Sequence, residues 1–366
     1  MKDNIFVSTE NGNGYDILIR RDFNDLADAL NELGFKGRRL CVISDDNVFP
    51  LYGEELKRSL GGVSENIYNV IFKAGEANKN LDTVREIYKA LTGYGFDRKD
   101  LILALGGGVT GDMAGFAAAT YLRGIDFIQI PTTLLACTDS SIGGKTGVDF
   151  EEYKNMVGAF KMPRLVYMNL MTLSSLHGRE FASGMGEIIK HGLIKDAPYY
   201  EWVINNFPEI NDRDLGILSE MISRSLEIKK GVVERDPYER GERALLNFGH
   251  TIGHAIEKYM DFKLLHGECV ALGSIAASFI SYRRGLLSTE EFYEIRDMYV
   301  PFNLPITLPD DADPAQILSL TKADKKMDKG QIRFILLKKP GKAFIDTTVS
   351  DEEIIAAIKE LIIRDE

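Results

Sequence analysis

Three of the five histidines lie within seventeen consecutive positions, and this segment is the first candidate for chemistry. His250 and His254 are four residues apart in LNFGHTIGHAIEKY (246–259), and His266 follows in LLHGE. A single buried histidine is usually a core residue, but histidine is also the commonest protein ligand for zinc, and catalytic zinc typically has three protein ligands. The spacing alone predicts that His250 and His254 both bind a metal ion. The pattern is not HExxH, which excludes a metalloprotease of that class.

A polar stripe is expected along the same segment. Spacings of four, three and four residues would place four side chains on one face of a helix: Arg243, Asn247, His250 and His254. Gly249 and Gly253 flank the histidines, although glycine inside a helix costs about 1 kcal/mol relative to alanine. We expect the close approach of another backbone, or of a ligand, to offset this cost.

An acidic metal ligand is available in SGMGEIIKHG (183–192). Glu187 and Lys190 share a helix face there, and His191 is also four residues from Glu187. The alternative is a Glu–Lys pair that simply faces solvent, which is the usual place for such pairs.

A second candidate site is the glycine-rich turn GGGVTGD (106–112), which follows the apolar run LILAL and opens a helix. It matches GxGxxG at Gly106, Gly108 and Gly111, a pattern that lets backbone amides approach a pyrophosphate. A tight strand-to-helix turn without a ligand is the alternative. The acidic residue that holds the ribose usually follows about 20 residues later at a strand end. Asp126 precedes its strand and therefore does not fit.

Better candidates for the ribose lie earlier in the chain. Asp45 and Asn47 stand where the run CVIS ends, although SDDN also suits a turn or a helix cap. GEANK (75–79) also follows a strand, and its Glu76 and Lys79 either cap the next helix or contact a nucleotide.

Basic residues gather within or beside these motifs in a chain that is otherwise acidic. This clustering predicts a ligand with several negative charges. The two lysines of ADKKMDKG are the weakest members, because charge runs usually face solvent. The basic residues are Arg123, Lys145, Lys154, Lys190, Arg243, Lys325 and Lys326.

Composition limits the possible partners. The 366-residue chain has a net charge of −11, which opposes binding to nucleic acid or to an anionic membrane. MKDNIFVSTE lacks the apolar core of a signal peptide, and no apolar run reaches the roughly 18 residues of a membrane span. Cys41, Cys137 and Cys269 form no CxxC pair, so neither a disulfide framework nor a cysteine zinc site is expected. A soluble cytoplasmic protein fits best.

These candidates must be positioned by an α/β framework. The runs RRLCVIS, NIYNVIF, LILAL and DFIQI alternate with helical patterns, which predicts a mainly parallel sheet flanked by helices. Strand signals fade after RLVYMNL, and helical spacing then continues to about residue 325. Late runs QIRFILL and KAFIDTT predict a hairpin followed by a closing helix. We expect two domains, an α/β domain over 1–175 and a mostly helical domain over 176–366.

Five motifs occur in an order that resembles the 3-dehydroquinate synthase family: GGGVTGDMAGFAAATYLRGIDFIQIPTTLLA, DSSIGGKTGV, KNMVGAF, SGMGEIIKHG and LNFGHTIGHAIE. The resemblance spans about residues 40–330. It implies a Rossmann-like N-terminal domain that binds NAD and a C-terminal helical domain that binds one divalent metal, zinc or cobalt. It also implies a homodimer.

The resemblance further implies the reaction. The family converts 3-deoxy-D-arabino-heptulosonate 7-phosphate (DAHP) to 3-dehydroquinate and phosphate, the second step of the shikimate pathway that leads to the aromatic amino acids. The C5 hydroxyl is oxidised by NAD, phosphate is eliminated, C5 is reduced again, and the opened ring closes by an aldol addition. NAD is thus regenerated in each turnover.

The matching positions imply the site residues. The metal ligands are Glu187, His250 and His266, which makes His254 a substrate-contacting and proton-handling residue instead of a ligand. The residues around the substrate are Arg123, Asp139, Lys145, Asn155, Lys190, Arg243, Asn247, His254 and Lys325, with Lys326 as an alternative to Lys325. The NAD residues are Asp45, Asn47, Glu76, Lys79, Gly107, Gly108, Val109, Thr110, Gly111, Asp112, Thr132, Thr133, Lys145, Lys154, Thr172 and Ser175. Phosphate and carboxylate are expected to meet Lys145, Lys190, Arg243 and Lys325.

Three alternatives remain open at this point. A sister sugar phosphate cyclase would make another carbocycle by the same steps. A metal-dependent polyol dehydrogenase would release NADH in step with its substrate. An NAD-binding regulator without catalysis would have no use for metal ligands at Glu187, His250 and His266.

Overall fold

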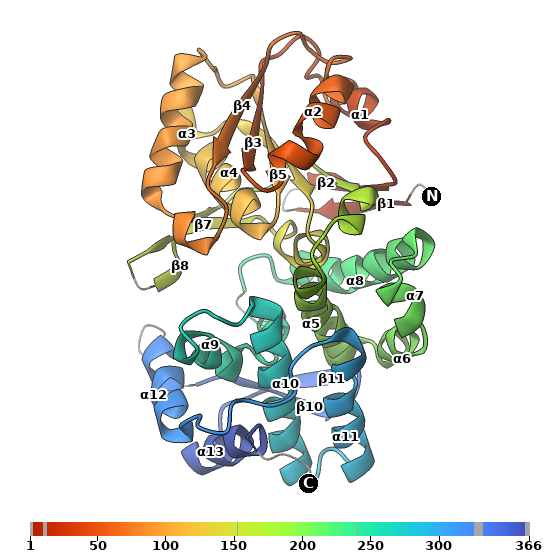
Figure 1. Cartoon of the computed structure of the whole chain (residues 1–366), viewed down its shortest axis with the longest axis vertical. Helices are drawn as coiled ribbons and strands as arrows, with labels where there is room; N and C mark the ends of the chain where they lie inside the picture. Colours follow the sequence, from red (N-terminus) through yellow and green to blue (C-terminus); the bar gives the residue numbers. More distant parts are fainter. Residues whose placement is uncertain (1–2, 10–12, 152, 240, 326–331, 363–366) are drawn as a thin grey trace. The chain divides into compact units, whose positions relative to one another are not determined.

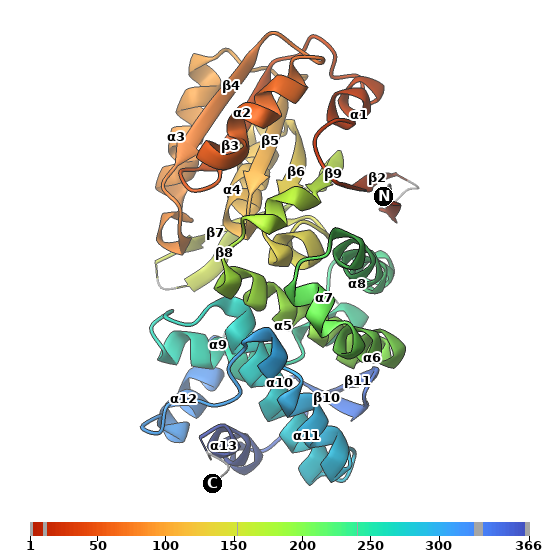
Figure 2. The same cartoon turned by 45° about the vertical axis from the view of Figure 1, so that its right-hand side comes forward.

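The computed structural model describes residues 3–9, 13–151, 153–239, 241–325 and 332–362. They form two compact units, and Figures 1 and 2 show the elements of each. The first unit holds the chain up to Leu176 together with Leu215–Ser223. The second holds His177–Asp214 and the chain from Arg224 onward. None of the described helices combines the length and apolar character that a membrane span requires.

The first unit contains a seven-stranded sheet with the order β1-β2-β9-β6-β5-β3-β4. Among the described strands of this sheet, β1 pairs antiparallel with β2, and every other neighbouring pair is parallel. This confirms the predicted mainly parallel α/β fold. The strands are β1 (Asp3–Ser8), β2 (Gly14–Arg20), β3 (Leu40–Asp45), β4 (Ile67–Phe72), β5 (Leu101–Gly106), β6 (Asp126–Pro131) and β9 (Leu165–Asn169).

Helices cover both faces of this sheet (Figure 1). Alternate residues of a strand point to opposite faces, so Leu40 and Val42 of β3 pack with α1 and α2, whereas Cys41 and Ile43 pack with α3 and α4. The sheet is therefore buried on both faces, which explains its continuous apolar runs. The helices are α1 (Leu26–Glu32), α2 (Phe49–Leu60), α3 (Leu81–Gly93) and α4 (Gly108–Thr120).

The strand order creates a switch point between β3 and β5. From β3 the chain crosses through α2 to β4, and from β5 it crosses through α4 to β6 on the other side. The helices α2 and α4 lie on opposite faces. Ligands of such sheets bind beyond the carboxyl ends of the strands at this point.

Short elements complete the first unit. An antiparallel hairpin, β7–β8, and the two strands β1 and β2 were not predicted from the sequence. Most of β8 is exposed, so it has no buried face that would mark it as a strand. These elements are η2 (Glu76–Asn78), η3 (Tyr121–Arg123), the π-helical turn η4 (Ala136–Ser140), β7 (Lys145–Phe150), β8 (Tyr153–Phe160) and η5 (Leu170–Ser174).

The second unit is mostly helical, as predicted. Helices α5 and α10 are buried on all sides over most of their length, which fits their many glycines, alanines and serines. The helices are α5 (Gly178–Lys195), α6 (Ala197–Asn205), α7 (Phe207–Asn211), α8 (Leu215–Arg235, begun in the first unit), η6 (Glu242–Asn247), α9 (His250–Tyr259), α10 (His266–Arg283), α11 (Thr289–Asp297), η7 (Val300–Phe302), α12 (Pro314–Lys325) and α13 (Asp351–Glu360). The predicted late hairpin and closing helix are confirmed as β10 (Phe334–Lys339), β11 (Lys342–Asp346) and α13.

The predicted polar stripe on one continuous helix is wrong. Residues 242–247 form the 3-10 helix η6, Phe248 is extended, and α9 begins only at His250. Gly249 has a φ of 80°, a left-handed conformation that favours glycine and interrupts the helix. Arg243 and Asn247 therefore lie on a different element from His250 and His254.

Candidate active site

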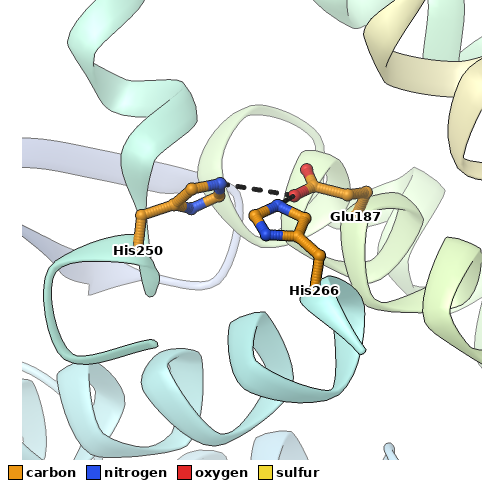
Figure 3. Close-up of side chains that lie close together, drawn as sticks. All are labelled: Glu187, His250 and His266. Atoms are coloured by element: carbon orange, nitrogen blue, oxygen red, sulfur yellow. Dashed lines mark ion pairs between the residues drawn. The ribbon is translucent and has the colours of Figure 1, made fainter. Parts of the chain in front are cut away.

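Three side chains from three helices of the second unit converge on one point (Figure 3). Oε1 of Glu187 on α5 lies 3.4 Å from Nε2 of His250 on α9 and 3.4 Å from Nε2 of His266 on α10. Ligands held 2.0–2.2 Å from a tetrahedral zinc ion are separated by about 3.3–3.5 Å. The spacing of these three atoms is therefore that of a metal-binding group.

The burial and the hydrogen bonding of Glu187 also fit a bound cation. This side chain is fully buried, and its Oε1 has no hydrogen-bond partner among the described atoms. A buried carboxylate oxygen without a partner is costly, and a cation between it and the two imidazoles would remove that cost. The residues present thus fit one divalent metal ion.

Burial and neighbouring charges shift the pKa values of the three side chains in different directions. Burial alone would raise the pKa of Glu187, but Lys190 and the two histidines lower it well below its usual range. Burial lowers the pKa of His250 to about 4, which leaves a neutral imidazole able to bind metal. Burial also opposes protonation of His266, but Glu187 and Glu257 outweigh it and raise its pKa to about 9.

Two contacts orient the side chains of His250 and Glu187. The Nδ1–H of His250 donates to the carbonyl oxygen of Phe248 at 3.1 Å, which leaves Nε2 with a lone pair toward Glu187. The ammonium of Lys190 donates to Oε2 of Glu187, and both side chains are buried. Oε2 of Glu187 is thus held by Lys190, while Oε1 is directed at His250 and His266.

Glycines bring the three helices close enough to build this group. A Cβ on Gly267 of α10 would lie 1.8 Å from the carbonyl oxygen of Ser183, and one on Gly186 of α5 would lie 2.5 Å from that of Gly267. Between α9 and α10, a Cβ on Gly273 would lie 1.9 Å from the carbonyl oxygen of Gly249, and one on Gly253 would lie 2.7 Å from that of Cys269. The expected backbone approach at Gly249 and Gly253 is confirmed.

Replacing Gly267 by alanine is therefore expected to separate α5 from α10 and weaken the site. The overlap with Ser183 involves backbone, so we expect a loss of more than about 3 kcal/mol of unfolding free energy, at the upper end for overpacking. Gly178→Ala is the matched control, because a Cβ there meets nothing within 4 Å. Denaturant unfolding of both variants measures the difference, and equal stabilities would contradict this account of the packing.

Other predicted residues of the second unit surround this group or lie near it in the chain. The exposed ring of His254 is 5.2 Å from that of His250 and 5.8 Å from that of His266, so the three rings cluster. The buried guanidinium of Arg243 donates to the carbonyl oxygen of Pro237. The amide of Asn247 donates to Glu239 at 2.6 Å.

Three further residues considered in the second half of the chain have different outcomes. His191 is buried, and its Nδ1 lies 2.7 Å from the hydroxyl of Ser225, as expected for a core histidine. Lys325 ends α12, whereas Lys326 lies outside the described residues.

In the first unit, the glycine turn lies at the switch point. Asp45 ends β3 and accepts hydrogen bonds from the amides of Asn47 and Val48 and, at 3.2 Å, from the hydroxyl of Thr110 on α4. Asp45 thus both turns the chain and links the end of β3 to the first turn of α4. The buried hydroxyl of Thr132, just beyond β6, has no hydrogen-bond partner among the described atoms. The N-terminus of α4 and the unsatisfied hydroxyl of Thr132, whose amide donates to the carbonyl oxygen of Gly106, thus lie beside the turn, and a helix N-terminus favours the binding of an anionic group such as a pyrophosphate.

The third glycine of this turn, Gly111, allows α4 to pack closely against β6. A Cβ on Gly111 would lie 2.6 Å from Oε1 of Gln129 on β6. Gly107 and Gly108 open α4, and Val109 lies in its first turn. Close helix-to-strand packing is the role of the third glycine in a GxGxxG turn.

A second cluster of predicted residues surrounds Lys79. Its ammonium lies 2.7 Å from Oδ2 of Asp112, contacts the amide oxygen of Asn155, and lies 4.0 Å from Glu76, which in turn lies 3.7 Å from the ammonium of Lys154. Burial would lower the pKa of Lys79, but the surrounding carboxylates outweigh it and raise the pKa. The structure thus brings five predicted NAD or substrate residues together.

The remaining predicted residues of the first unit are placed as follows. Arg123 is exposed and has a φ of 65°, Asp139 lies in η4, and Lys145 is exposed at the start of β7. Thr133 follows β6 and accepts from the amide of Ala136 through its hydroxyl. Tyr52 of α2 donates to the carbonyl oxygen of Thr172 at 3.3 Å and contacts the hydroxyl of Ser175.

The sequence analysis missed three buried charged side chains of the second unit. They are Lys229 on α8, Glu257 on α9 and Glu268 on α10. Glu268 pairs with Arg179 at 2.7 Å and caps α10 through the amide of Leu265. Charged residues are rarely buried without a partner, so a charge within a buried helical pattern was the available signal.

Comparison with known proteins assigns the family. Models of the N-terminal and C-terminal parts of 3-dehydroquinate synthase match residues 69–183 and 184–327. The 3-dehydroquinate synthase of Acetivibrio thermocellus is 42% identical over 344 residues, which cover 94% of this chain and 95% of that protein.

Two solved structures share the whole fold. The 2-epi-5-epi-valiolone synthase of Streptomyces hygroscopicus subsp. jinggangensis, with NAD+ and Zn2+ bound, is 31% identical with a TM-score of 0.88, over 97% of this chain and 98% of that one. A 2-deoxy-scyllo-inosose synthase complexed with carbaglucose-6-phosphate, NAD+ and Co2+ is 26% identical with a TM-score of 0.88, over 98% and 100% of the two chains. Sequence and structure agree, and the chain belongs to the 3-dehydroquinate synthase family.

Proposed function

We propose that this enzyme converts DAHP to 3-dehydroquinate and phosphate. The observation that carries the proposal is the group formed by Glu187, His250 and His266, in a chain that is 42% identical to a 3-dehydroquinate synthase. The same group argues against a regulator without catalysis, because such a protein has no need of a buried carboxylate aimed at two imidazoles.

The proposal includes one tightly held NAD and one divalent metal, zinc or cobalt. The two solved relatives bind NAD+ with Zn2+ or Co2+, and the metal-binding geometry and the glycine turn are present here. A bound metal would act as a Lewis acid toward the C5 hydroxyl of the substrate. We assign the metal and substrate to a domain over residues 176–366 and the NAD to a domain over 1–175.

The side chains divide into two roles under this proposal. His254, exposed beside the two histidine ligands, accepts and returns a proton of the substrate. Lys145, Lys190, Arg243 and Lys325 neutralise the phosphate and carboxylate, and the planar guanidinium of Arg243 is suited to a bidentate contact. The remaining residues that we place around the substrate are Arg123, Asp139, Asn155 and Asn247.

Turnover of DAHP tests the proposal. The purified enzyme with DAHP, zinc and a catalytic amount of NAD is expected to release one phosphate for each carbocyclic product, without net formation of NADH. NADH that accumulates in step with a polyol substrate would identify a dehydrogenase. Inactivity with DAHP but cyclisation of another phosphorylated sugar would identify a sister cyclase.

Assembly and location are proposed from the family alone. We propose a homodimer, which light scattering would test, and a cytoplasmic location. Cys41, Cys137 and Cys269 are buried thiols that form no disulfide with one another, in keeping with a reducing compartment.

A further inference from the structure

His266 differs from the other ligands because its ring faces carboxylates through both nitrogens. Its Nε2 lies 3.4 Å from Oε1 of Glu187, and its Nδ1 lies 3.9 Å from Oε2 of Glu257. Glu257 belongs to α9, one helical turn after His254, and its side chain is 6% exposed. A buried carboxylate thus stands behind a metal ligand.

The chemistry of a histidine ligand explains this arrangement. An imidazole that binds a metal through Nε2 keeps its proton on Nδ1, and the partner of that proton sets the tautomer and the ring orientation. His250 has the carbonyl oxygen of Phe248 for this purpose. The 3.9 Å separation at His266 is an ion-pair distance, and it places the carboxylate of Glu257 on the Nδ1 side of the ring.

We propose that Glu257 is a positioning residue that holds the Nδ1–H tautomer of His266 and keeps its Nε2 directed at the metal. The proposal rests on the metal site of the proposed function. Glu257 also adds a second buried negative charge near the ion. It does not touch the substrate or the metal, so its effect is on metal affinity first.

A different use of Glu257 must be distinguished. One ligand atom each of His254, Glu257 and His266 lies within 4.8 Å of the others, which would suit a second cation. That cation would require His266 to bind metals through both nitrogens and so to lose its last ring proton. A single ion, with Glu257 as the acceptor of that proton, avoids this loss.

Metal titration of the metal-free enzyme tests the proposal with Glu257→Gln, which keeps the size of the side chain but removes its charge. We expect one zinc per chain in the unmodified enzyme and a dissociation constant about 10- to 100-fold higher in E257Q, measured by competition with a chelating dye. The absorption spectrum of the cobalt form should also change, because the orientation of His266 shifts. Glu353→Gln is the control, since Glu353 pairs with Arg284 at 2.6 Å and contacts no histidine among the described residues. It should bind zinc normally.

Each outcome of the titration tests a different part of the proposal. No metal bound to the unmodified enzyme would refute the proposed function. Normal zinc affinity in a folded E257Q would overturn the role of Glu257 alone. Two ions in the unmodified enzyme, with the weaker one lost in E257Q, would replace positioning by a second site. If E257Q does not fold, Glu257→Asp keeps the charge on a shorter side chain, and zinc affinity that stays unchanged in this folded variant would equally overturn the proposal.

Discussion

Replacing His250 by alanine is expected to remove the bound metal and to lower kcat by more than about 100-fold. Loss of a residue that merely orients a ligand costs about 10- to 100-fold in metal affinity or activity, and loss of the ligand itself exceeds this. His250 supplies one of the three converging atoms, and its Nε2 lies 3.4 Å from Glu187. Elemental analysis of the purified variant and phosphate release from DAHP measure the two effects.

His254→Ala is the matched control for this experiment. His254 lies on the same helix with its ring 5.2 Å from that of His250, but it is exposed and belongs to the proton-handling residues in the proposed function. We expect this variant to retain its metal while kcat falls by about 100- to 10,000-fold, the usual contribution of a general acid or base. Loss of the metal from both His250→Ala and His254→Ala would restore the assignment based on spacing, in which both histidines are ligands.

Replacing Lys190 by methionine is expected to destabilise the metal-free enzyme by about 3–5 kcal/mol. Glu187 and Lys190 are 0% and 1% exposed, and removing one partner leaves the other as an uncompensated buried charge. Denaturant unfolding measures the loss. Added zinc should restore much of it, because the cation compensates Glu187 in place of the ammonium.

The pH dependence of that stability follows from Glu187. Its folded pKa lies well below its unfolded value, so its contribution is present above the unfolded pKa of about 4.3 and is lost as pH falls through the folded pKa. Lys190→Met should remove this contribution. Lys230→Met is the control, because Lys230 and Glu227 have the same three-residue spacing at 3.3 Å, but Glu227 is exposed and Lys230 only half-buried. It should cost less than about 0.5 kcal/mol, and an equal cost in both variants would contradict the role of burial.

The elements that carry periodic signals were predictable. The buried runs of β3, β5 and β6 and the glycine turn that opens α4 follow from local pattern, because a strand buried on both faces is apolar throughout. The strands β1, β2, β7 and β8 were missed. Their pairing depends on distant partners, and the mostly exposed β8 has no apolar face.

The metal-binding group was likewise predictable from the sequence only in part. The family resemblance carried by the motifs predicted Glu187, His250 and His266 as ligands, whereas spacing alone favoured His250 and His254, and the described structure brings Glu187, His250 and His266 together. Spacing failed where it assumed one helix, because Gly249 takes a left-handed conformation and α9 begins after it. It also gave no sign of Glu257, whose relation to His266 exists only across two packed helices.

The sequence alone thus determined the α/β class and the glycine turn, since these depend on residue type and on contacts between near neighbours in the chain, and its motifs carried the family resemblance that points to Glu187, His250 and His266. Tertiary structure decided how the ligands converge. Their positions depend on backbone contacts among α5, α9 and α10 at Gly186, Gly267 and Gly273, and such contacts join segments whose mutual distance no local pattern encodes.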